Sequence, residues 1–208
     1  MGKRKALSNV LLLGILAGCS SAGEGAADLT APVISEPKPA ASLKSAAASD
    51  QPSQSEQEGI VPESIEIPKL GIVTAVEKTG LLEDGSMGVP EKDENTAWYK
   101  QGAKPGDYGN AVIAGHVDNK TGPAVFFKLN SLKPGDEVLI TDAKGTKLTF
   151  IVEKAEAYPY DDAPIQQIFG PSDRKGLNLI TCTGIYDQSK RTHLERLVVY
   201  TVLKDEPA

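Results

Sequence analysis

The sequence has few histidines and cysteines, and fewer basic than acidic residues. It has two histidines and two cysteines among 208 residues, too few for a Cys/His zinc site of the usual spacing. Its 22 basic residues are outnumbered by 28 acidic ones. The net charge of −6 argues against a sequence-independent nucleic-acid binder, which needs a basic surface to displace counterions from phosphates. We therefore expect no metal, no cofactor and no nucleic-acid partner.

Aromatic residues are absent from the first 97 positions, and the first is Trp98. A segment without aromatic side chains lacks the largest core anchors, so the chain is not expected to be folded uniformly. Residues 20–62 are dominated by Ala, Ser, Pro, Glu and Gln, a composition that cannot bury enough apolar area to offset its ordering entropy. We predict a disordered tether over residues 19–62 and one folded domain over residues 63–208.

A long hydrophobic run is also missing from the N-terminus. Three basic residues at positions 3–5 precede an apolar run at 10–17 that is too short to span a bilayer as a mature helix. Residues 16–19 read Leu-Ala-Gly-Cys and resemble the lipobox of bacterial lipoproteins. The resemblance implies a signal peptide over residues 1–18 and a lipid on Cys19. The alternative is an ordinary signal peptide cleaved near Ala22, with Cys19 discarded.

From residue 63 the sequence changes to short β-type runs separated by turn signals. Pro-Gly-Asp turns are expected at 105–107 and 134–136 and an Ala-Lys-Gly turn at 143–145, while segments 124–130 and 164–169 are predicted to be briefly helical. No strand is regularly followed by a long amphipathic helix, which argues against a doubly wound sheet. We predict a mainly β fold with seven or eight short strands in a closed or nearly closed barrel. The β-type runs are residues 64–67, 72–76, 111–114, 137–141, 147–154, 177–182 and 194–203.

Three side chains that suit acyl transfer are predicted at strand positions. Cys182 is the one cysteine of the predicted domain and ends an apolar strand before a glycine-bearing loop. His116 follows the strand at 111–114, and Arg196 interrupts an apolar strand. A thiolate can attack a carbonyl, an imidazole can protonate the leaving amine, and a guanidinium can stabilise the oxyanion. The alternative is that Cys182 is an inert packed thiol.

At these positions the sequence resembles the sortase family of bacterial cysteine transpeptidases, which have an eight-stranded β-barrel. The resemblance covers roughly residues 63–206 and rests on Ala-Gly-His at 114–116, Leu-Ile-Thr-Cys at 179–182 and Arg-Leu-Val-Val at 196–199; the stretch 98–129 looks most like class F. It implies that Cys182 is the nucleophile, His116 the general acid/base and Arg196 the carbonyl-stabilising arginine. Thr181 is implied to orient the substrate or the arginine.

Other residues compete for the same roles. His193 is a second candidate base, and Arg191 and Arg174 are other candidate guanidinium groups. We favour His116 because His193 lacks the Ala-Gly-His context and is expected to be exposed, and we favour Arg196 because Arg191 lies in a polar turn. Adjacent Asp161 and Asp162 are interpreted as solvated loop residues rather than as metal ligands.

The resemblance also implies a reaction and its partners. A sorting-signal peptide of Leu-Pro-X-Thr-Gly type would be cleaved after the threonine to give a thioester on Cys182. An amine, commonly from a peptidoglycan precursor, or water would then accept the acyl group. The loop at about 158–175 is implied to face the substrate. We expect a monomer, lipid-anchored at the outer face of the cell membrane. The alternative is a catalytically silent surface lipoprotein that binds peptide or cell-wall material through the barrel.

Overall fold

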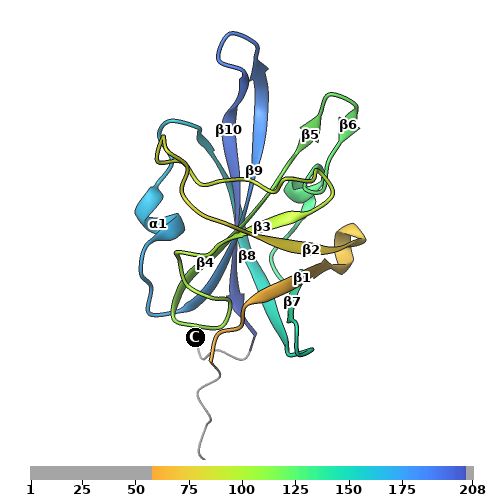
Figure 1. Cartoon of the computed structure of the whole chain (residues 1–208), viewed down its shortest axis with the longest axis vertical. Coiled ribbons are helices and arrows are strands. Elements are labelled where there is room, and N and C mark those ends of the chain that lie inside the picture. Colours follow the sequence, from red (N-terminus) through yellow and green to blue (C-terminus); the bar gives the residue numbers. More distant parts are fainter. Residues whose placement is uncertain (1–57, 205–208) are drawn as a thin grey trace, which may run out of the picture. The chain divides into compact units, whose positions relative to one another are not determined.

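The computed structural model describes residues 58–204 of the chain (Figure 1). The predicted signal peptide, Cys19 and nearly all of the predicted tether lie outside the described residues. Within them, no helix is long and apolar enough to cross a membrane. The strands are β1 Pro62–Ile67, β2 Ile72–Thr79, β3 Thr96–Tyr99, β4 Gly109–Gly115, β5 Asp118–Asn119, β6 Gly122–Pro123, β7 Glu137–Asp142, β8 Lys147–Pro159, β9 Lys175–Asp187 and β10 Thr192–Leu203.

Eight of these strands form a closed barrel in the order β1-β2-β3-β4-β9-β10-β8-β7. Most neighbours are antiparallel, but β2 pairs with β3 and β4 pairs with β9 in parallel. The closed eight-stranded barrel confirms the predicted mainly β fold. The sequence does not predict β3, because four residues between turn-rich segments form too short a pattern to indicate a strand.

The short helices differ from prediction at one of two places. The segment at 164–169 is helical as predicted, with α1 over Ile165–Phe169. The segment at 124–130 is instead a series of turns ending in the 3-10 helix η2, Leu129–Ser131, and a second 3-10 helix, η1, covers Pro68–Leu70. The backbone bonds there run from residue i to i−3, which brings the buried side chains of Phe126 and Leu129 to the same side.

The barrel strands bury both of their faces near the centre of the fold. Along β4, Ile113 belongs to the large interior cluster with Leu179 and Val199. The alternate residues Val112 and Val198 belong to a second cluster on the outer face of the sheet, which also contains Ile168 of α1. Because successive side chains of a strand point to opposite faces, β4, β9 and β10 each have an inner and an outer apolar row. We call the second cluster the outer-face cluster.

Two amide side chains, of which that of Asn178 is buried, fix α1 against this outer face. Asn178 Nδ2 of β9 donates to the carbonyl of Ile168 at 2.7 Å. Asn110 Nδ2 of β4 donates to the carbonyls of Gln167 and Gly170, each at 3.2 Å. A five-residue helix is too short to be stable by itself, so these bonds and the burial of Ile168 hold it in place.

Residues just before the predicted start of the domain at residue 63 already pack against the barrel. Ile60 is buried in the interior cluster and its amide donates to the carbonyl of Pro105 at 2.9 Å. Gly59 N donates to the carboxylate of Asp107 at 2.6 Å. The turn at 105–107 was predicted, and Gly106 has the positive φ of 97° that this turn requires.

Gly115, the last residue of β4, lies against a fully buried aromatic ring. A Cβ built at this position would come within 2.5 Å of Cδ2 of Phe126. The amide of Phe126 also donates to the carbonyl of His116 at 2.9 Å, so the ring cannot move without disturbing that residue. The glycine of the Ala-Gly-His motif is therefore required by packing.

We predict that Gly115→Ala lowers the free energy of unfolding by about 1–3 kcal/mol, because the added methyl overpacks the Phe126 site. Urea denaturation of the full chain followed by circular dichroism measures the change. Combining Gly115→Ala with Phe126→Leu should cost less than the sum of the two single losses, since the smaller side chain makes room. An unchanged midpoint in Gly115→Ala would contradict this account of the motif.

Candidate active site

The thiol and the guanidinium predicted from the sequence lie on neighbouring antiparallel strands. In the register of β9 and β10, Cys182 pairs directly with Arg196. Directly opposed residues of adjacent strands have their side chains on the same face, with Cβ atoms about 4.5–5.5 Å apart. Arg196 follows the same alternation as Val198 and Tyr200, which lie in the outer-face cluster. Cys182 and Arg196 therefore emerge on the outside of the barrel.

His116 follows the strand that lies on the other side of β9 from Arg196. Strand β4 pairs in parallel with β9, and Ala114 is opposite Ile180. Cys182 lies two positions further along β9, on the face of Ile180, and His116 is the first residue after β4. The fold thus brings Cys182, His116 and Arg196, the candidate trio, to neighbouring positions along three adjacent strands. Strand β9 continues through Asp187, so Cys182 does not end its strand as predicted.

Thr181 fixes the alignment of the two strands next to the candidate trio. It is buried, and its hydroxyl donates to the carbonyl of Gly115 at 2.8 Å. Because Thr181 precedes Cys182 in a strand, its side chain points to the opposite face, toward the barrel interior. The bond joins the residue before the thiol to the residue before the imidazole.

His116 is half-buried, and its imidazole makes one hydrogen bond within the described part of the chain. Its Nε2 lies 3.0 Å from the carbonyl of Pro90. A carbonyl can only accept, so Nε2 is the donor and the neutral ring has its free lone pair on Nδ1. The Nδ1 atom is therefore available to exchange a proton with another group.

The Arg196 guanidinium is oriented by the start of its own strand. Nη1 donates to the carbonyls of His193 and Glu195, both at 2.9 Å, and Nη2 donates to Thr192 Oγ1 at 3.0 Å. These bonds use three of the five N–H donors of an arginine. The Tyr160 ring lies 5.8 Å from the guanidinium carbon.

The competing candidates lie in other surroundings. His193 is half-buried, not exposed as predicted, and its Nε2 is 3.2 Å from Oδ1 of Asp118. Arg174 forms an ion pair with Glu153, and Arg191 is an exposed turn residue with a positive φ of 56°. Among residues 58–204, no three His, Cys, Asp or Glu side chains gather as metal ligands.

Tyr158 is a neighbour of the site that sequence reasoning did not single out. It pairs with Arg196 in the register of β8 and β10, on the opposite side from Cys182. Its hydroxyl bonds to the carboxylate of Glu156 and lies 3.1 Å from the hydroxyl of Tyr200. No local pattern marks this tyrosine, because its position depends on the pairing of two strands far apart in the sequence.

Comparison with known proteins identifies the family. The sortase domain family matches residues 65–204, which is well over half of the chain. The chain belongs to the sortase family. Its members are cysteine transpeptidases. No curated protein matches the chain by sequence.

Solved sortase structures share the fold. A lid mutant of sortase A from Corynebacterium diphtheriae is 22% identical, with 73% of this chain and 74% of that chain covered and a TM-score of 0.55. Sortase C1 from Streptococcus agalactiae is 20% identical, with 70% and 68% covered and a TM-score of 0.54. Sortase C-1 from Actinomyces oris is 19% identical, with 70% and 73% covered and a TM-score of 0.51. At these identities the likeness shows the shared barrel fold.

The thiol of this sortase is free and half-buried. Burial raises the pKa of Cys182 above its ordinary value, the nearby Arg196 charge acts to lower it, and the Asp118 carboxylate acts to raise it. An ordinary cysteine already has its pKa near 8.5, so the thiol form dominates at neutral pH. Only a small fraction is present as the nucleophilic thiolate.

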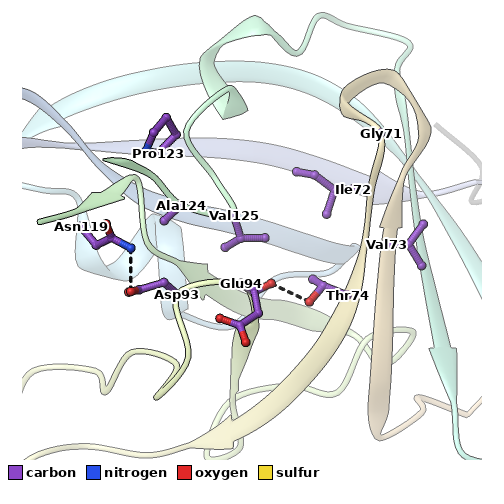
Figure 2. Close-up of a pocket in the computed structure, with 10 residues that line it drawn as sticks. All are labelled: Gly71, Ile72, Val73, Thr74, Asp93, Glu94, Asn119, Pro123, Ala124 and Val125. Carbon is purple, nitrogen blue, oxygen red and sulfur yellow. Dashed lines mark hydrogen bonds between the residues drawn. The ribbon is translucent and has the colours of Figure 1, made fainter. Parts of the chain in front are cut away.

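A separate pocket of about 510 Å³ opens beside the strands of this sortase (Figure 2). It lies between the start of β2, the segment before β3 and the β5–β6 hairpin. None of the candidate trio lines it. Its two carboxylates are engaged or exposed: Asp93 accepts from Asn119 at 2.8 Å, while Glu94 is exposed. The pocket is therefore distinct from the trio.

We predict that alkylation of Cys182 by iodoacetamide rises with pH and has its midpoint above the ordinary cysteine value, because thiolate forms only as the pH passes the raised pKa. Arg196→Gln should move the midpoint higher by removing the favourable charge. Mass spectrometry of the peptide containing Cys182 measures the rate. Arg174→Gln, which changes an arginine bound to Glu153, is the control. A midpoint at or below the ordinary value would refute the prediction.

Proposed function

We propose that this sortase cleaves a sorting-signal peptide of Leu-Pro-X-Thr-Gly type through a thioester on Cys182 and transfers the acyl group to an amine or to water. The observation that carries the proposal is that Arg196 pairs directly with Cys182 across β9 and β10, while His116 directly follows β4, the strand on the other side of β9. The proposed nucleophile, acid/base and charge-stabilising group thus belong to three adjacent strand segments.

In the first half-reaction the Cys182 thiolate attacks the carbonyl carbon of the threonine–glycine bond. The carbonyl electrons move onto the oxygen, and Arg196 stabilises the resulting negative charge with its N–H donors that the described chain leaves unused. The carbon–nitrogen bond then breaks, and the protonated imidazole of His116 gives its proton to the leaving amine. The product is an acyl thioester on Cys182 and a free glycine amine.

In the second half-reaction an amine attacks the thioester carbonyl and His116 takes its proton. The carbon–sulfur bond breaks and the electrons return to sulfur, which restores the thiolate. Water can replace the amine and gives the free acid. We propose a peptidoglycan precursor as the amine donor, and sorting-signal-bearing surface proteins as the acyl donors.

The segment around α1 is the proposed wall of the peptide site. It lies between β8 and β9 and is held to the sheet by Asn178 and Asn110. Ile165 at the start of α1 is exposed and apolar, as a contact for an apolar peptide side chain would be. Tyr160 approaches Arg196 from the same segment.

We further propose class F membership and a lipid anchor on Cys19. The lipobox-like Leu-Ala-Gly-Cys at 16–19 supports the anchor, since two acyl chains give stable membrane attachment. The long Ala/Ser/Pro/Glu-rich stretch that follows would let a monomeric catalytic domain work in the cell wall, at the outer face of the membrane.

Cys182→Ala should abolish cleavage of a fluorogenic sorting peptide by the full chain, because it removes the thiol that forms the acyl-enzyme. His116→Ala and Arg196→Ala should each lower kcat/KM by about 100-fold or more. Cys19→Ala is the matched cysteine control and should retain wild-type cleavage of a soluble peptide. Mass spectrometry with and without added amine identifies the products.

Two outcomes would overturn the proposal. Cleavage that survives Cys182→Ala would remove the nucleophile assignment. Binding of the peptide without turnover in the wild type, together with a Cys182 that resists alkylation in the folded protein, would instead establish a silent binding lipoprotein.

Cys19→Ala should release the protein from the membrane fraction of expressing cells, because the acceptor for the lipid is lost. Immunoblotting of membrane and medium fractions measures the distribution, and treatment with a globomycin-type inhibitor of lipoprotein processing should change the size of the wild type alone. Continued membrane integration of the variant would contradict the lipid anchor.

A further inference from the structure

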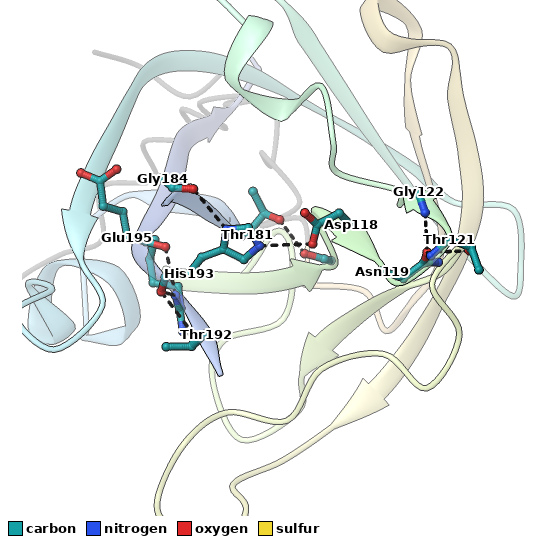
Figure 3. A network of polar contacts seen from close by, with 11 residues as sticks. Asp118, Asn119, Thr121, Gly122, Thr181, Gly184, Thr192, His193 and Glu195 are labelled. Atoms are coloured by element: carbon teal, nitrogen blue, oxygen red, sulfur yellow. Dashed lines mark hydrogen bonds and ion pairs between the residues drawn. The ribbon is translucent and has the colours of Figure 1, made fainter. Parts of the chain in front are cut away.

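Two hairpins meet beside the candidate trio through a histidine and a carboxylate. The β9–β10 hairpin and the β5–β6 hairpin extend at the same end of the barrel strands (Figure 1). His193 at the start of β10 points at Asp118 at the start of β5, with Nε2 3.2 Å from Oδ1 (Figure 3). The His193 side chain is 14% exposed and that of Asp118 is 46% exposed. The bond joins residues 75 positions apart.

The second ring nitrogen of His193 is bonded as well. Nδ1 lies 3.2 Å from the carbonyl of Gly184 on β9, and the ring packs edge-on against Tyr186 with centroids 5.2 Å apart. A carbonyl and a carboxylate both accept, and a neutral imidazole has only one N–H. Both contacts can therefore be hydrogen bonds at the same time only when each ring nitrogen has a proton.

Asp118 is held on a rigid base. Its neighbour Asn119 closes the β5–β6 turn by accepting from the amides of Thr121 and Gly122 at 2.7 and 2.9 Å. The Asn119 amide also donates to Asp93 at 2.8 Å. The carboxylate thus belongs to a structured hairpin, and it lies only two residues after His116.

The other end of the contact leads directly to Arg196. The His193 carbonyl accepts from Nη1 of Arg196 at 2.9 Å, and Thr192 beside it accepts from Nη2 at 3.0 Å. Any movement of His193 therefore shifts two of the acceptors that orient the guanidinium. A path thus runs along the backbone from His116 to Asp118, across the side-chain contact to His193, and through the His193 carbonyl to Arg196.

From this path we infer that Asp118 and His193 are a pair of positioning residues for the transpeptidation, which lock the His116 segment to the strand that orients Arg196. The inference rests on the proposed function. Neither residue touches the reacting atoms in this role; each acts by keeping the imidazole and the guanidinium at fixed places around Cys182. The Asp118 charge also acts on the Cys182 thiol, whose pKa it raises, which is consistent with its place beside the site.

A double-mutant cycle on the full chain tests the pair. Asp118→Ala and His193→Phe should each lower kcat for the sorting peptide by about tenfold and leave KM within about twofold, because misplacement of catalytic groups mainly affects the chemical step. The double variant should be no slower than either single variant, since the second change removes a contact already lost. Asp118→Asn retains an acceptor oxygen and should recover part of kcat. Asp173→Ala, an exposed carboxylate ahead of β9, is the control.

Amide hydrogen exchange gives a second readout that needs no turnover. Exchange in the β9–β10 hairpin should rise equally in both single variants and in the double variant, while exchange in β1 and β7 stays unchanged. If the wild type turns over and both single variants keep its kcat, the positioning role is overturned and the proposed function stands. The same conclusion follows if the losses of kcat in the two single variants multiply in the double variant. Absence of wild-type turnover would overturn the proposed function and the positioning role with it.

Discussion

The pairing of β9 with two different strands is the constraint on which the site depends. Its antiparallel partner β10 sets Arg196 opposite Cys182, and its parallel partner β4 ends where His116 begins. The bond from the Thr181 hydroxyl to the Gly115 carbonyl fixes the second pairing at the point where it matters. A shift of one residue in either register would turn one member of the trio to the barrel interior.

The same geometry acts on the pKa of the Cys182 thiol in two opposing ways. The outer face of the sheet is apolar enough to raise the pKa of Cys182, while the Arg196 guanidinium opposes that effect from the adjacent strand. A half-buried thiol is protected from bulk solvent but is present mostly in its protonated form at neutral pH. Catalysis at such a site depends on the positions of the charged groups around the sulfur. The contact between Asp118 and His193 lies next to these groups.

Much of the fold could be predicted because the local patterns agree with it. Seven of the eight barrel strands coincide with apolar β-branched runs, and the turns contain glycines such as Gly106 with the required positive φ. The strand β3 and the 3-10 character of the segment before residue 132 could not be predicted, since each depends on contacts with distant residues. His193 was expected to be exposed because nothing near it in the sequence indicates the carboxylate at residue 118.

The sequence by itself determined the chemistry available to this protein: a lone domain thiol, a histidine directly after an apolar strand and an arginine within one. It also carried the motif resemblance that the family comparison bears out. Only the tertiary structure decided which face of the sheet Cys182 and Arg196 share and which groups hold Arg196 and His116. Register between strands such as β4 and β9, 66 residues apart at Gly115 and Thr181, is a long-range property of the closed barrel. Side-chain alternation then converts that register into proximity.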